Sequence, residues 1–186
     1  KNRLALCSKE SPLTKRLEYF TRSVHPAFFW CAGSWNLRTD QNQKIRGVQR
    51  SMLRKMCHFK RREAEVTETF MSRTNRFIKD LLKREDMVFW DVLVRREIFK
   101  WAGWTARLNI YDCSRITLHI LLYKNWDWIQ KIAAQNKGNQ LHCRHLRVWR
   151  WESLIYNYFK ENHPGTTWLE LAQDDREWMS IVQKIH

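Results

Sequence analysis

Three arginines, Arg46, Arg50 and Arg54, stand four residues apart in the segment from Thr39 to Phe59. If that segment is helical, residues four apart lie on one face, so the three guanidinium groups form a single row. A guanidinium group can fork onto two phosphate oxygens, and each one placed on a phosphate releases condensed counterions. The spacing therefore indicates a surface that binds the nucleic-acid backbone without reading its sequence.

Basic residues gather in three segments of the chain, and these extend the predicted interface. The first segment runs from Lys44 to Arg62, the second from Arg73 to Arg84 and the third from Arg144 to Arg150. In the third, tryptophans stand among the arginines, and an indole ring can stack on an unpaired base. The predicted nucleic-acid ligands are Lys44, Arg46, Arg50, Arg54, Lys55, Lys60, Arg61, Arg62, Arg73, Arg76, Arg107, Arg144, Arg147, Trp149 and Arg150. For any one segment, a solvated helix face is the alternative.

The charge balance of the whole chain favours an anionic partner. Its 186 residues include 34 Lys and Arg against 19 Asp and Glu, a formal net charge of +15 at pH 7. A chain with this excess repels itself unless an anionic molecule lies against it. Nucleic acid is the commonest such partner, and an anionic membrane surface is a less common one. Because the arginine fork spans two phosphate oxygens, it suits duplex or folded RNA, and we expect RNA in preference to DNA.

Polymerase chemistry needs paired carboxylates that hold Mg²⁺ ions, and the sequence lacks that signature. Tyr111-Asp112 supplies one acid, and Asp174-Asp175 is the one adjacent pair of aspartates. That pair falls in a segment of helical periodicity, with Asp175 on its apolar side. We interpret the pair as helix-surface acids near an N-terminus, where the helix dipole favours negative charge. Gly-rich phosphate loops and the GxSxG and HExxH motifs are also absent from the sequence. We therefore expect a protein that is not an enzyme.

The cysteines and histidines do not form a metal-binding pattern. The potential ligands of His142-Cys143-Arg144-His145 are too close together to share one tetrahedral ion easily, and Cys57-His58 is the other candidate. The 5 cysteines have no CxxC spacing, which is typical of reduced thiols in an intracellular protein. We expect no metal and no cofactor, and the sequence leaves mitochondrion, nucleus and cytoplasm open. No apolar run approaches the length of a membrane span.

The residues that could bind nucleic acid need helices to position them, and apolar residues recur at helical spacing along most of the chain. With 5 Gly and 3 Pro, the sequence has little loop material. Helices are expected over residues 11–25, 39–59, 66–82, 88–108, 116–134, 143–160 and 168–185. We predict an all-α fold, an irregular bundle of about six to eight amphipathic helices. Residues 1–134 are predicted to form one helical domain and residues 135–186 a C-terminal helical extension, packed on it or continuous with it.

Local signals predict where several of these helices begin, break or end. Ser11-Pro12 is a helix start, with Ser11 as the N-cap, and Pro26 is expected to stop the first helix. The apolar stripe of residues 88–108 changes face around Arg95-Arg96, which predicts a kink or two abutting helices. Thr167 and Glu170 have the spacing of a capping box.

The 11 tryptophans fall into two groups by their surroundings. Trp101, Trp168 and Trp178 stand at core spacing, and we expect them to be structural. Trp149 and Trp151 lie beside arginines, and they are candidates for base stacking or for contact with a partner protein.

Four short motifs stand in order between residues 13 and 180. Gly33-Ser34-Trp35-Asn36-Leu37 follows an aromatic-rich stretch, and Met52-Leu53-Arg54-Lys55-Met56 lies on the next expected helix. Trp101-Ala102-Gly103-Trp104-Thr105-Ala106-Arg107 and the segment from Trp168 to Trp178 come later. This order resembles the region after the palm in non-LTR (LINE-type) retrotransposon reverse transcriptases, with Trp104 in place of that family's usual histidine.

The resemblance implies a thumb and post-thumb region, a helical part of the polymerase that contacts nucleic acid, without the catalytic palm. Two settings stay open. The chain can be a thumb fragment of an active retroelement polymerase, or a structural subunit recruited into a large ribonucleoprotein such as an organellar ribosome, with protein partners around it. The alternative from a different class is a protein–protein scaffold that docks through aromatic faces.

Overall fold

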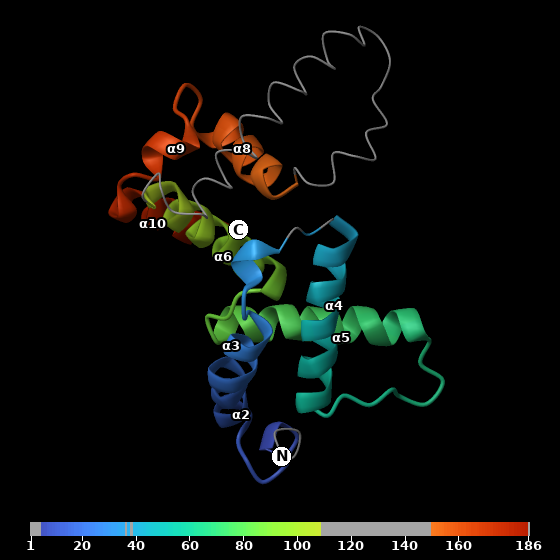
Figure 1. Cartoon of the computed structure of the whole chain (residues 1–186). Coiled ribbons are helices and arrows are strands. Elements are labelled where there is room, and N and C mark those ends of the chain that lie inside the picture. Colours follow the sequence, from blue (N-terminus) through green and yellow to red (C-terminus); the bar gives the residue numbers. More distant parts are fainter. Residues whose placement is uncertain (1–4, 36, 38, 109–149, 186) are drawn as a thin grey trace, which may run out of the picture. The chain divides into compact units, whose positions relative to one another are not determined.

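The computed structural model describes residues 5–35, 37, 39–108 and 150–185 (Figure 1). The described residues form helices and connecting segments and contain no strand, which confirms the all-α prediction. The chain divides into two compact units. Unit 1 consists of Lys1–Ala32 and Leu37–Arg95, and unit 2 consists of Gly33–Asn36 and Arg96–His186. The predicted boundary between residues 134 and 135 and the helix expected over 116–134 lie outside the described residues.

Unit 1 is built from helices whose amphipathic faces meet in one core. Its elements are α2 (Leu13–Tyr19), η1 (Phe20–Val24), α3 (His25–Phe28), α4 (Thr39–Met56), α5 (Thr67–Arg84) and the first part of α6 (Trp90–Arg107). The core residues are Leu6, Leu17, Phe20, Leu53, Met56, Ile78, Leu81, Leu82 and Trp90. Trp90 is fully buried and lies parallel to the ring of Phe20, with 5.5 Å between ring centroids.

The first helix departs from its prediction at both ends. It begins at Leu13 with Pro12 as its N-cap, and no side chain caps it, so the expected cap by Ser11 is wrong. Pro26 does not stop the helix either, because the chain passes through the π-helical segment η1 into α3 with Pro26 in its first turn. Proline clashes with the carbonyl group four residues earlier in an α-helix. The wider π-helical turn before Pro26 relieves that clash, and the helical path continues.

Buried polar side chains tie the helices of unit 1 together. Gln49 of α4 is fully buried; its Oε1 accepts a hydrogen bond from the backbone N–H of Trp90 at 2.9 Å, and its Nε2 donates to the carbonyl of Val88 at 3.2 Å. Arg16 of α2 is also buried, and its Nη1 donates to the carbonyl of Met56 in the last turn of α4. The negative end of the α4 dipole stabilises that cation.

Helix α6 is continuous through Arg95-Arg96, so of the two predicted alternatives, a kink or two abutting helices, the second is wrong. The boundary between the two units falls at this pair of residues. Trp90, before it, belongs to the core of unit 1, and Phe99, after it, is buried against Trp178 of unit 2. The apolar stripe changes face because the two parts of one helix belong to different cores.

Unit 2 is centred on Trp178. Its described elements are the second part of α6, α8 (Arg150–Asn162), α9 (Trp168–Leu171) and α10 (Asp175–Lys184), while the 3-10 turn η2 (Ala32–Ser34) lies at its first boundary. Trp178 is fully buried, stacks on Phe159 with centroids 5.4 Å apart, and donates from Nε1 to the carbonyl of Phe99 at 2.8 Å. A Cβ at Gly103 would lie 2.2 Å from that Nε1, so the indole needs a glycine at this position.

The C-terminal segment confirms one local prediction and corrects another. Thr167 and Glu170 form the capping box of α9, with both reciprocal hydrogen bonds present. The expected single helix over 168–185 is wrong, because Asp174 leaves helical geometry and its side chain accepts hydrogen bonds from the backbone N–H groups of Arg176 and Glu177. Asp174 is thus the N-cap of α10, and Asp175 is exposed in its first turn rather than on an apolar side.

Candidate nucleic-acid interface

The arginine row predicted on α4 has partners inside unit 1. Arg46 donates from Nε to Oδ1 of Asp91 at 2.9 Å and from Nη2 to Oδ2 at 2.5 Å, which makes a two-pronged ion pair between α4 and α6. Its guanidinium carbon also lies 4.8 Å from the ring centroid of Phe89. Arg54 donates from Nη1 to Oδ1 of Asn75 on α5 at 3.0 Å.

Arg50, between them, lies against the same ring of Phe89, 5.3 Å from its centroid. Its Nε is buried and has no hydrogen-bond partner among the described residues. Burial lowers the pKa of Arg50, and the neighbouring charge of Arg46 lowers it further. Burial also lowers the pKa of Arg54, with a smaller effect from Arg50. The row that the spacing assigned to nucleic acid therefore packs α4 against α5 and the start of α6.

Other predicted ligands lie elsewhere. Lys44 is exposed on α4, 3.9 Å from the Asp40 carboxylate, and Lys55 is exposed near the end of that helix. Arg107 belongs to unit 2, where Nη1 donates to the carbonyl of Ala172 at 2.9 Å and Nη2 pairs with Asp175 at 2.6 Å. Three of the predicted ligands, Arg144, Arg147 and Trp149, lie outside the described residues, as does the side chain of Arg150, whose backbone begins α8.

The connector between α4 and α5 is fixed by one carboxylate, that of Glu65. Its two oxygens accept from Nε and Nη2 of Arg73, each at 2.9 Å, and Oε2 also accepts from the backbone N–H of Arg62 at 3.0 Å. These hydrogen bonds lower the pKa of Glu65 to about 2. Arg73 reaches back along the connector as well, donating from Nη2 to the carbonyl of Lys60 at 3.3 Å. Arg73, predicted as a ligand, thus positions the connector on α5.

This arrangement leaves two sets of cations on the surface of unit 1. Lys60, Arg61 and Arg62 are exposed on the connector, and Arg76, Lys79 and Lys83 are exposed on α5. The α5 residues follow the spacing i, i+3, i+7, so they lie on one face, opposite the buried Ile78 and Leu81. We name these six residues the connector–α5 face. In the described part of the chain, none of the six forms a salt bridge with a carboxylate side chain.

Four members of the connector–α5 face belong to the predicted ligand set, namely Lys60, Arg61, Arg62 and Arg76. Lys79 and Lys83 were within the second basic segment but outside that set. Their helical spacing from Arg76 is the sequence signal that could have included them.

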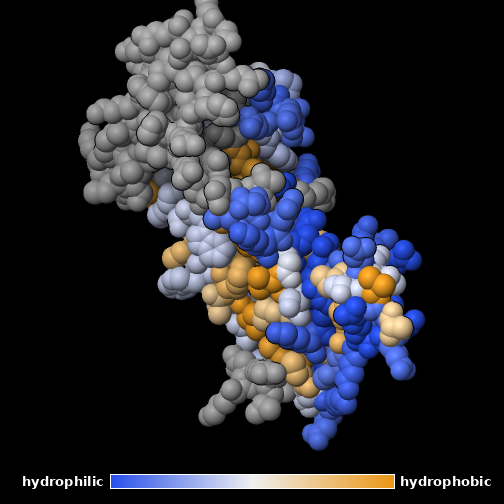
Figure 2. Space-filling model, turned by 90° about the vertical axis from the view of Figure 1, so that its right-hand side faces the viewer, coloured by the Kyte–Doolittle hydropathy of each residue, from blue (hydrophilic) through white to orange (hydrophobic). Residues whose placement is uncertain are grey.

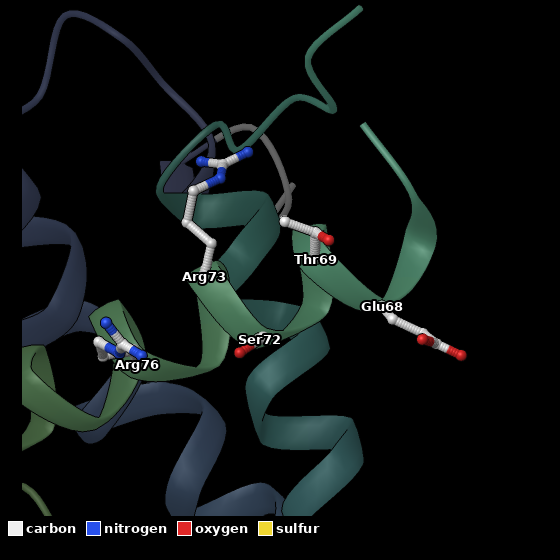
Figure 3. A pocket seen from close by; sticks show the side chains of 5 residues that line it. All are labelled: Glu68, Thr69, Ser72, Arg73 and Arg76. Atoms are coloured by element: carbon white, nitrogen blue, oxygen red, sulfur yellow. The ribbon is translucent and has the colours of Figure 1, made fainter. Parts of the chain in front are cut away.

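Beside this face, and sharing Arg76 with it, a shallow pocket opens on α5 (Figure 3). It is lined by Glu68, Thr69, Ser72, Arg73 and Arg76. Figure 3 shows the five side chains along successive turns of α5, with Glu68 pointing away from the two arginines. The pocket therefore combines hydroxyl groups with guanidinium groups, the donors that hold phosphate oxygens.

The charge of the chain is concentrated in unit 1. This unit holds 21 of the 34 Lys and Arg and 10 of the 19 Asp and Glu, a formal charge of +11 against +4 in unit 2. Figure 2, which views the molecule from the side toward which the connector projects in Figure 1, shows a hydrophilic surface next to a band of apolar side chains. Val66 and Phe77 are exposed apolar residues of this region.

The described residues hold no group of three or more His, Cys, Asp or Glu side chains that could bind a metal ion. Burial raises the pKa of the Cys57 thiol, which disfavours the thiolate that a metal would need. The His142–His145 run lies outside the described residues. Of the helices that the structure describes, none is both long and apolar enough to cross a membrane.

No family model, no curated protein and no solved structure matches this chain.

Proposed function

We propose that this protein is a non-catalytic, RNA-binding structural protein in which the connector–α5 face of unit 1 holds the nucleic-acid backbone. The observation that carries the proposal is the set of six exposed cations without carboxylate partners in the described chain, on a unit with a formal charge of +11. None of the six has to leave a carboxylate to reach a phosphate, although Arg61 also donates from Nε to the backbone carbonyl of Glu65. Each phosphate contact releases counterions.

The order of motifs in the sequence suggests where such a protein could have come from, namely a reverse-transcriptase thumb region. A reverse-transcriptase thumb region without its palm would keep its affinity for nucleic acid while having no polymerase chemistry. Such a fragment suits a structural subunit of a large ribonucleoprotein such as an organellar ribosome, where RNA and protein neighbours surround a small basic chain.

A second function is favoured by a separate observation. Trp30 is 80% exposed and Trp104 is 50% exposed. Exposed tryptophans are typical anchors at protein–protein interfaces. A scaffold that docks through them is the competing proposal, and the connector–α5 face would then play no part in binding.

Salt titration separates the two proposals. We would measure binding of the full chain to fluorescein-labelled single-stranded RNA, duplex RNA and DNA by fluorescence anisotropy. The KCl concentration would run from about 50 to about 300 mM, a range over which the Debye length shortens markedly. If all six cations contact phosphates, log K against log salt has a slope of about −4 for single-stranded RNA and about −5 for a duplex. A chain that binds none of these nucleic acids at the lowest salt would refute the proposal and favour the scaffold.

Two variants that remove cations from different parts of unit 1 locate the interface, when their effects are compared per charge removed. The triple variant Lys60→Gln, Arg61→Gln, Arg62→Gln should reduce the slope by about 2 units. The control variant Lys9→Gln, Lys15→Gln removes exposed cations from the N-terminal segment and α2 and should change the slope by less than about 0.5. Equal effects per charge at the two locations would show that the net charge, and not this face, drives binding.

A further inference from the structure

The shallow pocket on α5 is lined by hydroxyl and guanidinium side chains, the groups that donate hydrogen bonds to phosphate. Thr69 and Arg73 are four residues apart, and so are Ser72 and Arg76, so each hydroxyl lies one helical turn from a guanidinium group. The two hydroxyl–guanidinium pairs line one pocket, and Figure 3 shows the guanidinium groups of Arg73 and Arg76 pointing in different directions from the helix. Phosphate oxygens accept several hydrogen bonds at once, and a cation strengthens them.

The two arginines of the pocket have different roles. Arg73 donates hydrogen bonds to the Glu65 carboxylate and the Lys60 carbonyl, so its side chain is held in place at one side of the pocket. Arg76 is exposed and has no ion pair in the described chain, so its charge is available to a ligand. Arg76 is therefore the residue that can form a new ion pair without breaking one.

The hydroxyl groups of the pocket are available too. Thr69 and Ser72 are exposed, and neither hydroxyl has a hydrogen-bond partner in the described part of the chain. Thr74, on the buried side of the same helix, differs from them. Its Oγ1 donates its one hydrogen to the carbonyl of Phe70 at 2.9 Å, so it cannot donate to a ligand as well. The free hydroxyls lie on the face that carries Arg76.

Resting on the proposed function, we infer that one backbone phosphate of the bound RNA occupies this pocket. Arg76 pairs with a phosphate oxygen, and the hydroxyls of Ser72 and Thr69 donate hydrogen bonds to the same group. Arg73 acts as a positioning residue that Glu65 holds in place. Glu68, at the edge of the pocket, repels the phosphate and limits the affinity of the site.

Variants of neighbouring residues should have effects of opposite sign. In the full chain, Arg76→Gln should weaken binding of a single-stranded RNA about fivefold to tenfold and reduce the salt slope by about 0.7. Glu68→Gln should strengthen binding about twofold to fivefold. Ser72→Ala changes no charge; it should weaken binding about threefold, the effect of one hydrogen bond, while the salt slope stays the same.

Two controls separate this pocket from general electrostatic attraction. Lys15→Gln removes one exposed cation from α2, and Glu10→Gln removes one exposed acid from the N-terminal segment. Each should change the affinity less than about twofold at 150 mM salt, because screening limits the reach of an exposed charge. Far-ultraviolet circular dichroism of every variant checks that the helices remain, and all five sites are exposed, so the fold should persist.

The outcomes distinguish the inference from the function on which it rests. If the wild-type chain binds RNA but Arg76→Gln behaves like Lys15→Gln and Ser72→Ala binds like the wild type, the pocket is not the phosphate site, while the proposed function stands. If the wild-type chain does not bind RNA at low salt, the proposed function and the inference both fail. The expected pattern, a loss at Arg76 and Ser72 with a gain at Glu68, supports both.

Discussion

Replacing Arg46 with glutamine should destabilise unit 1 by about 2 kcal/mol. The Arg46 side chain is 38% exposed and that of its partner Asp91 is 11% exposed. An ion pair at the surface contributes about 0–1 kcal/mol, whereas loss of one member of a buried pair costs about 3–5 kcal/mol. This pair lies between those limits, and the contact of Arg46 with the Phe89 ring adds about 0.5 kcal/mol.

Urea unfolding followed by tryptophan fluorescence measures this loss, because the core of unit 1 contains Trp90. The midpoint for Arg46→Gln should fall by roughly 1 M. A double-mutant cycle with Asp91→Asn should give a coupling of about 1–2 kcal/mol between the two side chains. RNA affinity, measured well below the midpoint, should change less than about twofold. An unchanged midpoint together with a tenfold loss of RNA affinity would refute this reasoning and place Arg46 on the RNA.

Two further predictions concern the connector and the core of unit 2. The pKa of Glu65 in the folded protein, about 2, lies below its ordinary value of 4.5. The ion pair therefore stabilises the protein above pH 4.5, and this stabilisation is lost as the pH falls toward 2. The urea midpoints of the wild type and of Glu65→Gln, measured across this range, should converge near pH 2. Gly103→Ala should destabilise the protein by about 3 kcal/mol, because the new methyl group displaces Trp178 and its hydrogen bond. Gly47→Ala on α4, where a Cβ meets nothing within 4 Å, should instead stabilise it by about 0.5–1 kcal/mol, and melting temperatures compare the two.

The helices that could be predicted best are those whose signals are local. The apolar spacing of residues 66–82 predicted α5 within two residues at each end, and Ile78, Leu81 and Leu82 of its apolar face are buried. The capping box of Thr167 and Glu170 was readable because both partners lie within four residues of each other. In such cases the pattern that forms the structure is the pattern that the sequence displays.

The partners of the α4 arginines could not be predicted in this way. Spacing establishes that Arg46, Arg50 and Arg54 share a face, but it does not indicate what that face meets. Arg46 pairs with a residue 45 positions later, and Arg54 bonds to one 21 positions later. A row of arginines has the same periodicity whether it packs another helix or faces solvent. The connector was equally hidden, because Glu65 and Arg73 form their ion pair across a loop and a helix start.

The acids of unit 1 determine which of its cations a polyanion can use. The two carboxylates with the least exposed side chains in its salt bridges, Glu65 at 6% and Asp91 at 11%, each hold an arginine. A phosphate that recruited Arg46 would leave Asp91 charged, largely buried and unpaired, at a cost of about 3 kcal/mol or more. Recruiting Arg76 breaks no such pair. If the chain binds a polyanion, competition within the fold should therefore direct it away from Arg46 and toward the connector–α5 face.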